Sequence, residues 1–224
     1  MIKIKSIYTR IPLLIRLNIH NKLSNPYSKY QNENKVIFVH IPKAAGNSVT
    51  KSLFGVKSTG HFTITNFFIK NPYKFYTYYK FCISRNPYSR FISAFEYLKE
   101  GGMSKTDREF YELYLNEFSS IQDFAQLLVD DYQFREKILS WTHFIPQYKF
   151  LLLFGRYRIL DNIYKVEELE SCINTISSEL NLNVKKLVHE NKTGNRSITI
   201  DEKLINAINI IYKRDFELLN YEKL

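Results

Sequence analysis

Two short apolar runs, each followed by a proline-containing turn and a helical pattern, organise the first half of the chain. The runs are residues 35–41 (KVIFVHI) and 80–84 (KFCIS). Nearly continuous apolar and β-branched residues are typical of strands buried on both faces of a parallel sheet. Helical patterns follow at residues 47–54 and 88–100. A strand, a tight turn and a helix, repeated twice, predict an α/β fold with a central parallel sheet flanked by helices.

The second half of the chain continues this pattern. Residues 106–150 are helical in pattern and rich in aromatic residues. Residues 158–166 (RILDNIYKV) predict a third strand, and residues 167–180 a helix after it. Thr199 and Glu202 have the spacing of a capping box, which predicts one long closing helix.

The chain has the size of one ordinary domain, with 224 residues of which 45% are hydrophobic. Residues 21–34 are polar and rich in turn-forming residues, which predicts a linker. We therefore expect an N-terminal extension over residues 1–34 and a single domain over residues 35–224. The uncharged apolar run at residues 11–15 is too short for a signal peptide or a membrane span. A leading helix packed on the domain is favoured over an amphipathic segment that makes peripheral membrane contact.

The formal net charge of +10 predicts attraction to polyanions. The lysines are spread along the chain instead of forming a block, which argues against a nucleic-acid partner. Cys82 and Cys172 lie in apolar runs without metal-ligand spacing, so neither a disulfide nor a metal site is expected. These features favour a cytoplasmic protein, with the inner membrane surface as an alternative location.

The first strand-to-helix turn, residues 40–48 (HIPKAAGNS), has the residues of a phosphate site. Ligands of open α/β sheets bind beyond the carboxyl ends of the strands. A lysine, a glycine that permits close backbone approach, and polar residues at a helix start offer a cation, N–H groups and a hydroxyl to an anion. The order differs from a Walker A loop, because the lysine precedes the glycine. The expected binding residues are Lys43, Ala44, Ala45, Gly46, Asn47 and Ser48.

The second turn, residues 85–93 (RNPYSRFIS), has a complementary composition. Asn86 and Pro87 suit the cap and first position of a helix, and Arg85 lies at the strand tip. Ser89 and Ser93 are four residues apart and share a helix face. A guanidinium fork with a serine hydroxyl suits a dianionic phosphate monoester.

The two segments IFVHIPKAAGNS and FCISRNPYSRFISAF together resemble a known pair of motifs. They are similar to the motifs that bind 3′-phosphoadenosine 5′-phosphosulfate (PAPS) in sulfotransferases of the carbohydrate and heparan-sulfate type, often called family 2. The likeness continues in Pro146-Gln147, in residues 161–169 and in the closing IYKRDFELLNY. Many relatives have Thr-Ala-Gly-Thr where this chain has residues 44–47 (AAGN). That difference removes a hydroxyl at position 44 and leaves Ser48 and backbone N–H groups for the 5′-phosphate.

The resemblance implies a fold akin to P-loop nucleotide kinases and a metal-free transfer of the sulfuryl group from PAPS to a carbohydrate hydroxyl by in-line displacement. It implies that Lys43 holds the bridging oxygen, and that Arg85 and Ser93 hold the 3′-phosphate. Lys192 matches a late basic loop that closes over the nucleotide in relatives. The implied acceptor is a glycan or a glycolipid.

A base must remove the proton of the acceptor hydroxyl, and relatives use a histidine or a glutamate for this. His61 lies between the two motifs and is our first choice, with a hydrogen-bonded structural role as the alternative. His143 is the other candidate, although it could equally line the acceptor groove. His40 ends a buried strand, where a histidine is more often structural. Glu96, on the polar side of the second helix, stays open.

Two other functions remain as alternatives at this point. One is a nucleotide kinase or NTPase on a related fold, which the missing Walker A order disfavours. The other is a basic module that binds nucleic acid or a membrane surface. The presence of Lys43, Arg85 and Ser93 in the two turns favours the enzyme.

Overall fold

A computed structural model describes residues 24–57, 60–182 and 199–224 of the protein. In this described part, a parallel sheet of three strands has the order β1-β2-β5. Its strands are β1 (Val36–Val39), β2 (Tyr79–Ser84) and β5 (Asn162–Lys165). All of β1 and nearly all of β2 are buried, because helices cover both faces of the sheet. The predicted central parallel sheet is confirmed.

The register of the sheet brings the two polar turns together. Val39 pairs with Cys82 across β1 and β2, and the two strands run in the same direction. The turns that follow them therefore leave the sheet at the same edge. This is the edge at which ligands of open α/β sheets bind.

The stretch predicted as one strand over residues 158–166 is divided in the structure. Its later part is β5, whereas its first residue belongs to a hairpin of β3 (Leu152–Leu153) and β4 (Tyr157–Arg158). The carboxylate of Asp161 accepts the backbone N–H of Lys80 at 2.6 Å and lies 3.3 Å from the Lys80 ammonium. This polar contact directs the chain into β5 alongside β2.

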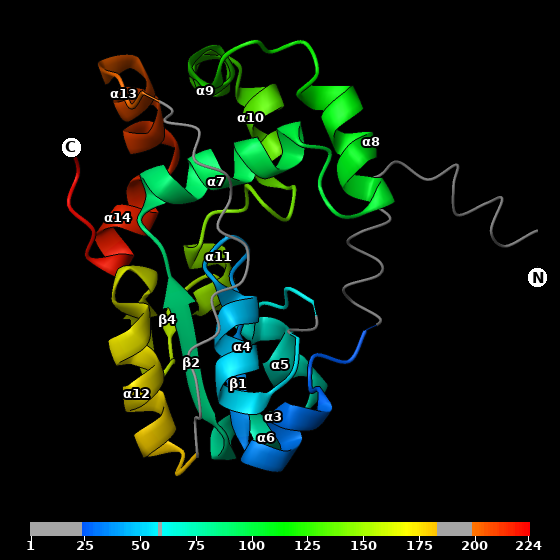
Figure 1. Cartoon of the computed structure of the whole chain (residues 1–224), viewed down its shortest axis with the longest axis vertical. Helices are drawn as coiled ribbons and strands as arrows, with labels where there is room; N and C mark the ends of the chain where they lie inside the picture. The colour runs from blue at the N-terminus through cyan, green and yellow to red at the C-terminus, as the bar shows by residue number, and fades with distance from the viewer. Residues whose placement is uncertain (1–23, 58–59, 183–198) are drawn as a thin grey trace, which may run out of the picture.

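Two helices cover one face of the sheet and shorter helices cover the other. Figure 1 shows α12 (Leu169–Glu179) beside β2 and α4 (Gly46–Phe54) beside β1. A short 3-10 turn, η1 (Val166–Glu168), leads into α12. The opposite face packs against α5 (Ile64–Lys70), α6 (Pro72–Thr77) and α11 (Tyr148–Leu151). The first face buries Val36, Phe38, Phe81 and Ile83, and the second buries Ile37, Val39 and Cys82.

A group of helices lies beyond the carboxyl end of β2, at the top of Figure 1. It consists of α7 (Pro87–Lys99), α8 (Lys105–Tyr114), α9 (Ile121–Asp130), α10 (Tyr132–Leu139) and α13 (Glu202–Ile211). Their shared core is aromatic, and Phe91, Phe124 and Phe144 lie within 6 Å of one another by ring centroids. The helical pattern predicted for residues 106–150 is confirmed. These helices form one wall of the region above the sheet edge.

The prediction of a linker over residues 21–34 is wrong for its last part. Residues Lys29–Asn34 form helix α3, which packs against β1. Tyr27 and Tyr30 are buried, and the Tyr27 hydroxyl donates to the carbonyl of Phe67 at 3.0 Å. Two aromatic side chains thus anchor a stretch whose composition is otherwise that of a loop. Residues 1–23, which carry the expected leading helix or membrane-contacting segment, lie outside the described residues. In the part of the chain that is described, no helix is long and apolar enough to span a membrane.

The closing helix is also interrupted, against the prediction of one long helix. Its two parts are α13 and α14 (Lys213–Leu219), and Tyr212 between them has φ −110° and ψ 23°. The side chain of Asp201, instead of Thr199, caps α13 by accepting the N–H of Leu204. The Tyr212 hydroxyl donates to the carbonyl of Phe144 at 2.9 Å. This hydrogen bond to a distant segment explains why the closing helix is interrupted at Tyr212, which the local sequence does not indicate.

Asp215 on α14 gives a stability prediction. Its carboxylate is fully buried and accepts the backbone N–H groups of Gln147 and Tyr148, each at 2.8 Å. Asp215→Asn places an amide N–H against one of these donors, so we expect the free energy of unfolding to fall by about 1–3 kcal/mol. Urea denaturation measures the change. Glu217→Gln, an exposed carboxylate-to-amide change on the same helix, should shift it by less than about 0.5 kcal/mol. Equal effects of the two variants would contradict the role of Asp215.

Candidate active site

The two polar turns border a cavity of about 300 Å³ at the sheet edge. Its position matches the expected ligand site of an open α/β sheet. The residues that line it are His40, Lys43, Ala45, Gly46, Asn47, Ser48, His61, Arg85, Ser93, Tyr97, Met103 and His143. The structure therefore brings together most of the residues predicted from the sequence. Ala44 is an exception, since its side chain packs in the core and its N–H donates to the carbonyl of Ile41 at 3.4 Å. Lys192 lies outside the described residues.

The β1–α4 turn has an unusual backbone. Lys43 and Ala45 have φ values of 66° and 56°, in the left-handed region that non-glycine residues seldom adopt. Such strain is tolerated where the surrounding structure enforces it, commonly at functional sites. Ala45 occupies the N-cap position of α4, where its methyl group cannot accept a hydrogen bond, and the first turn contains no acidic residue. The N-terminus of α4 thus presents its positive end to the cavity.

Gly46 is required by close packing against a histidine. A Cβ at this position would lie 1.9 Å from Cδ2 of His40. The glycine therefore lets the start of α4 approach the end of β1. Burial keeps the pKa of His40 well below its usual value, with His61 adding to the effect. This environment fits the structural role expected for His40.

Arg85 connects the second turn to the first. Its Nη1 donates to the carbonyl of Lys43 at 3.1 Å, and its Nε donates to Oγ of Ser89 at 3.1 Å. Gln147 holds the backbone of Arg85 through two hydrogen bonds, one to the N–H at 3.0 Å and one to the carbonyl at 2.7 Å. Ser93 lies one helical turn beyond Ser89 and faces the same cavity. The two turns therefore act as one unit.

The cavity is strongly cationic. Burial, with the nearby charge of Arg85, lowers the pKa of Lys43 to about 8. The Lys43 ammonium lies 4.0 Å above the ring of Tyr97, which stabilises a cation through the ring face. A bound anion would relieve the repulsion between the two cations. This set of donors fits phosphate or sulfate groups.

Two further histidines line the cavity beside His40. Nδ1 of His61 lies 3.1 Å from the carbonyl oxygen of His40, so Nδ1 carries the proton. Nε2 of His143 lies 3.2 Å from Oδ1 of Asp107, and the rings of His61 and His143 are 6.3 Å apart. Burial lowers the pKa of His61 to about 4 and also lowers the pKa of His143. Glu96 lines a different hollow, between α7 and the start of α9.

Within the described residues, no group of three or more His, Cys, Asp or Glu side chains is arranged to hold a metal ion.

A family model described as the sulfotransferase family matches residues 27–222. The chain belongs to this family. The resemblance of the two turns to family 2 sulfotransferases, and the P-loop-like α/β fold that it implied, are confirmed. The protein is therefore a sulfuryl-transferring enzyme. No curated protein and no solved structure matches the chain.

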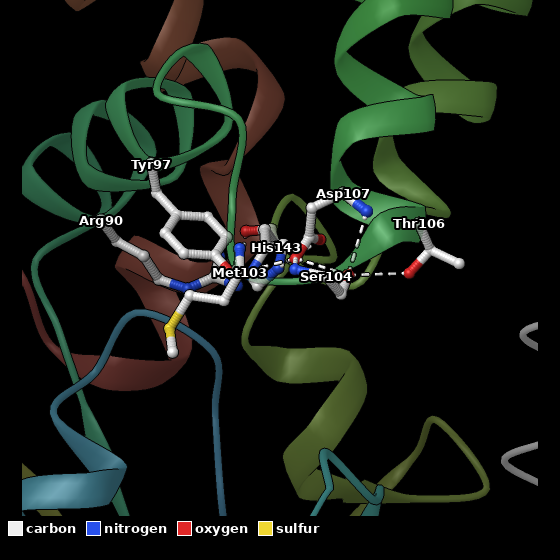
Figure 2. A network of polar contacts seen from close by, with 7 residues as sticks. All are labelled: Arg90, Tyr97, Met103, Ser104, Thr106, Asp107 and His143. Atoms are coloured by element: carbon white, nitrogen blue, oxygen red, sulfur yellow. Dashed lines mark hydrogen bonds and ion pairs between the residues drawn. The ribbon is translucent and has the colours of Figure 1, made fainter.

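The sequence reasoning missed several residues of this sulfotransferase site, among them Met103, which lines the cavity, and three that the polar network depends on. Figure 2 shows them: Arg90, Tyr97 and Asp107. Arg90 is buried and donates to the carbonyls of Pro42 and His143 at 3.0 and 3.2 Å. Tyr97 lies one helical turn after Ser93, so the two side chains share a helix face. This spacing could have predicted that Tyr97 faces the cavity. Asp107 could not be recognised as easily. Its position three residues after a serine is already explained by a capping box at a helix start, so the sequence gives no reason to assign it a second role.

The lowered pKa of Lys43 predicts a pH dependence of anion binding by the sulfotransferase. The protonated ammonium binds the anion, and a bound anion raises the pKa of Lys43 above its value of about 8 in the free enzyme. Affinity should therefore be constant below about pH 7 and should fall as pH rises through 8. Thermal-shift titrations with inorganic sulfate from pH 6.5 to 9.5 measure this, because sulfate itself does not titrate there. Lys43→Met should bind more weakly and lose the dependence. A pH-independent affinity in the unaltered enzyme would contradict the prediction.

Proposed function

We propose that this sulfotransferase transfers the sulfuryl group of PAPS to a hydroxyl of a carbohydrate acceptor and releases adenosine 3′,5′-bisphosphate. The observation that carries the proposal is the pairing of two cations in one cavity. Lys43 and Arg85 come from different turns, and a hydrogen bond from the Arg85 guanidinium to the Lys43 carbonyl joins them. A donor with one phosphate at each end of a nucleoside can engage both turns at once.

The β1–α4 turn would hold the 5′-phosphosulfate end of the donor. Lys43, the positive end of α4 and the Ser48 side chain lie on the cavity wall. The residues after Lys43 contribute backbone only, because Ala44 and Ala45 carry methyl groups and Gly46 carries no side chain. The hydroxyl that many relatives place at position 44 is thus replaced by a methyl packed in the core.

The β2–α7 turn would hold the 3′-phosphate, which distinguishes PAPS from ATP. The Arg85 guanidinium offers paired N–H donors, and the Ser93 hydroxyl offers a further donor from the next turn of α7. Gln147 fixes the backbone of Arg85, so the guanidinium has a rigid base. The closing role of Lys192 over the nucleotide stays a prediction from the sequence.

The reaction exchanges one bond to sulfur for another. The acceptor oxygen forms a bond to sulfur as the bond between sulfur and the 5′-phosphate oxygen breaks, and the electron pair of that bond stays on the phosphate. The hydroxyl proton passes to a base in the cavity, for which His61 and His143 are the candidates. Lys43 stabilises the charge that builds on the leaving phosphate, as in phosphoryl transfer, where positioning and charge stabilisation dominate.

The proposed acceptor is a glycan or a glycolipid. The family assignment and the net charge of +10, which suits acidic sugars, support this class. The free, buried Cys82 and Cys172 suit a reducing, cytoplasmic location. Incubation with PAPS and dextran, hyaluronan or a lipid-linked sugar, followed by mass spectrometry for added sulfate, tests the proposal. If none of these acceptors were sulfated while a non-sugar alcohol was, the carbohydrate assignment would be contradicted.

Adenosine 3′,5′-bisphosphate should stabilise the enzyme far more than AMP, because only the bisphosphate engages both turns. At about 100 times its dissociation constant, the expected gain is roughly 2.7 kcal/mol. Thermal shifts with the two nucleotides at equal concentration provide the measurement, and Arg85→Ala should abolish the difference. Equal shifts in the unaltered enzyme would remove the support for a 3′-phosphate site at Arg85 and Ser93.

Lys43 and Arg85 should act at different stages of the reaction. The charge near Lys43 develops mainly in the transition state, so Lys43→Ala should lower kcat by about 10²- to 10³-fold with a smaller loss of donor affinity. The 3′-phosphate keeps its charge throughout, so Arg85→Ala should raise KM for PAPS, through a loss of about 1.5–3 kcal/mol of binding free energy, with little change in kcat.

Steady-state kinetics at varied PAPS and saturating acceptor separate the two effects. Lys57→Ala, at an exposed lysine just after α4, is the matched control and should leave both constants unchanged. If Arg85→Ala lowered kcat alone while Lys43→Ala raised KM alone, the two turns would be assigned to the wrong ends of the donor.

A further inference from the structure

Tyr97 contacts both the cation proposed for the leaving phosphate, Lys43, and one of the two candidate bases, His143. Its ring lies 4.0 Å from the Lys43 ammonium and 4.8 Å, between ring centroids, from the imidazole of His143. Its hydroxyl donates to Oδ2 of Asp107 at 2.9 Å and accepts the N–H of Met103 at 2.9 Å. Figure 2 shows Tyr97, Asp107 and His143 converging from α7, α8 and the segment before α11.

The carboxylate of Asp107 is held in one orientation. Its Oδ2 accepts three donors, which are the Tyr97 hydroxyl at 2.9 Å, the Ser104 hydroxyl at 2.8 Å and the Ser104 N–H at 3.2 Å. Its Oδ1 is directed to Nε2 of His143. Burial raises the pKa of Asp107, but its hydrogen bonds with His143, Ser104 and Tyr97 outweigh burial and bring the pKa to about 2. The carboxylate behind the imidazole is therefore ionised at neutral pH.

This carboxylate determines the tautomer of His143. An ionised carboxylate only accepts hydrogen bonds, so Nε2 of His143 carries the proton and Nδ1 carries the lone pair. Nδ1 is buried, and no hydrogen-bond partner reaches it among the described residues. The imidazole itself lines the cavity. A buried acceptor without a partner is costly, and a substrate hydroxyl is a donor that would satisfy it.

We propose that Asp107 and Tyr97 are positioning residues. They hold His143 as the base for the acceptor hydroxyl and keep it at a fixed distance from Lys43. This inference rests on the proposed function. It reverses the order of the two histidines that the sequence favoured.

The surroundings of His61 make it the weaker candidate. Its Nδ1–H bonds to a neutral carbonyl, that of His40, so an imidazolium formed there lacks the hydrogen-bonded carboxylate that His143 has. Burial lowers the pKa of His143, Asp107 raises it, and Lys43 and Arg90 lower it further. The other titratable groups beside the ring are His61 and Tyr97. Only the Asp107 contact stabilises the positive charge that a base acquires.

The arrangement couples proton removal to departure of the phosphate. Nδ1 of His143 takes the hydroxyl proton as the acceptor oxygen bonds to sulfur, and the phosphate oxygen that leaves sulfur keeps the bonding electron pair. Positive charge then develops at His143 and negative charge near Lys43, at the two groups that Tyr97 contacts. Tyr97 fixes the separation of these groups, which is the structural requirement for an in-line reaction.

Asp107→Asn is the central test. The amide oxygen of asparagine would take the place of Oδ2, because three donors require an acceptor there. The amide N–H₂ would then face Nε2 and favour the lone pair on that atom, which moves the His143 proton to Nδ1. We expect kcat to fall by about 10²- to 10⁴-fold. The thermal shift produced by adenosine 3′,5′-bisphosphate should stay unchanged.

Asp123→Asn is the matched control. Asp123 also lies three residues after a serine N-cap and bonds to it, at the start of α9, but its side chain is 59% exposed and is not part of the cavity lining. The same chemical change at the same helix position should leave kcat unaltered. A loss caused by a weakened helix start would be shared by the two variants.

Two readouts separate positioning from simple structural support. Histidine ¹⁵N NMR should report Nε2–H for His143 in the unaltered enzyme and Nδ1–H in Asp107→Asn, with His143→Gln providing the assignment. The acidic limb of the residual kcat against pH should move to lower pH in Asp107→Asn, because the carboxylate raises the pKa of His143. Tyr97→Phe keeps the ring under Lys43 and removes both hydrogen bonds of the hydroxyl, the one to Asp107 and the one from the Met103 N–H, so it should lower kcat by about 10- to 100-fold.

The outcomes distinguish this inference from the proposed function. Enzyme that converts no PAPS with any acceptor contradicts the proposed function. Active enzyme in which Asp107→Asn keeps its kcat within about threefold, or keeps the Nε2–H tautomer, overturns the positioning role alone. The same holds if His61→Ala loses activity while His143→Ala retains it.

Discussion

The buried guanidinium of Arg90 holds the two sides of the site together. Its side chain is 2% exposed, and it donates to the carbonyl of Pro42 in the first turn and to the carbonyl of His143 on the facing segment. A charge removed from water is stable only with such partners, and the nearby carboxylate of Asp215 adds to them. Arg90 lies on α7, between Ser89 and Ser93. Arg90 therefore links three parts of the site: the β1–α4 turn, helix α7, which carries Ser93, and the segment that contains His143.

Much of the fold and of the anion site was predictable because its signals are local. β1, β2 and the helices after them follow from apolar runs and turn residues within about ten positions of each other. Parallel pairing then places both turns at one edge, so Lys43, Arg85 and Ser93 meet without further information. His61 and His143, the two predicted candidates for the base, line the same cavity.

The residues that were missed depend on contacts between distant segments. Asp107 reads as a helix-capping residue, and only the approach of α8 to the segment around His143 gives it a second partner. Arg90 reads as a surface arginine in a helix, because its carbonyl partners lie 48 and 53 positions away. The break at Tyr212 has the same origin, in a hydrogen bond to Phe144. Tertiary contacts of this kind override local propensity.

The hydrogen bond between the Arg85 guanidinium and the Lys43 carbonyl makes the site a molecular ruler. It ties the cation of one turn to the backbone of the other, while Gln147 clamps the backbone on the opposite side of Arg85. The spacing between the two polar turns is thus set by contacts within the protein itself. For a nucleotide bound as proposed, selection acts on the span between its two charged groups. Isomers that carry the same groups at another separation, such as a 2′,5′-bisphosphate, would be rejected by length instead of by charge.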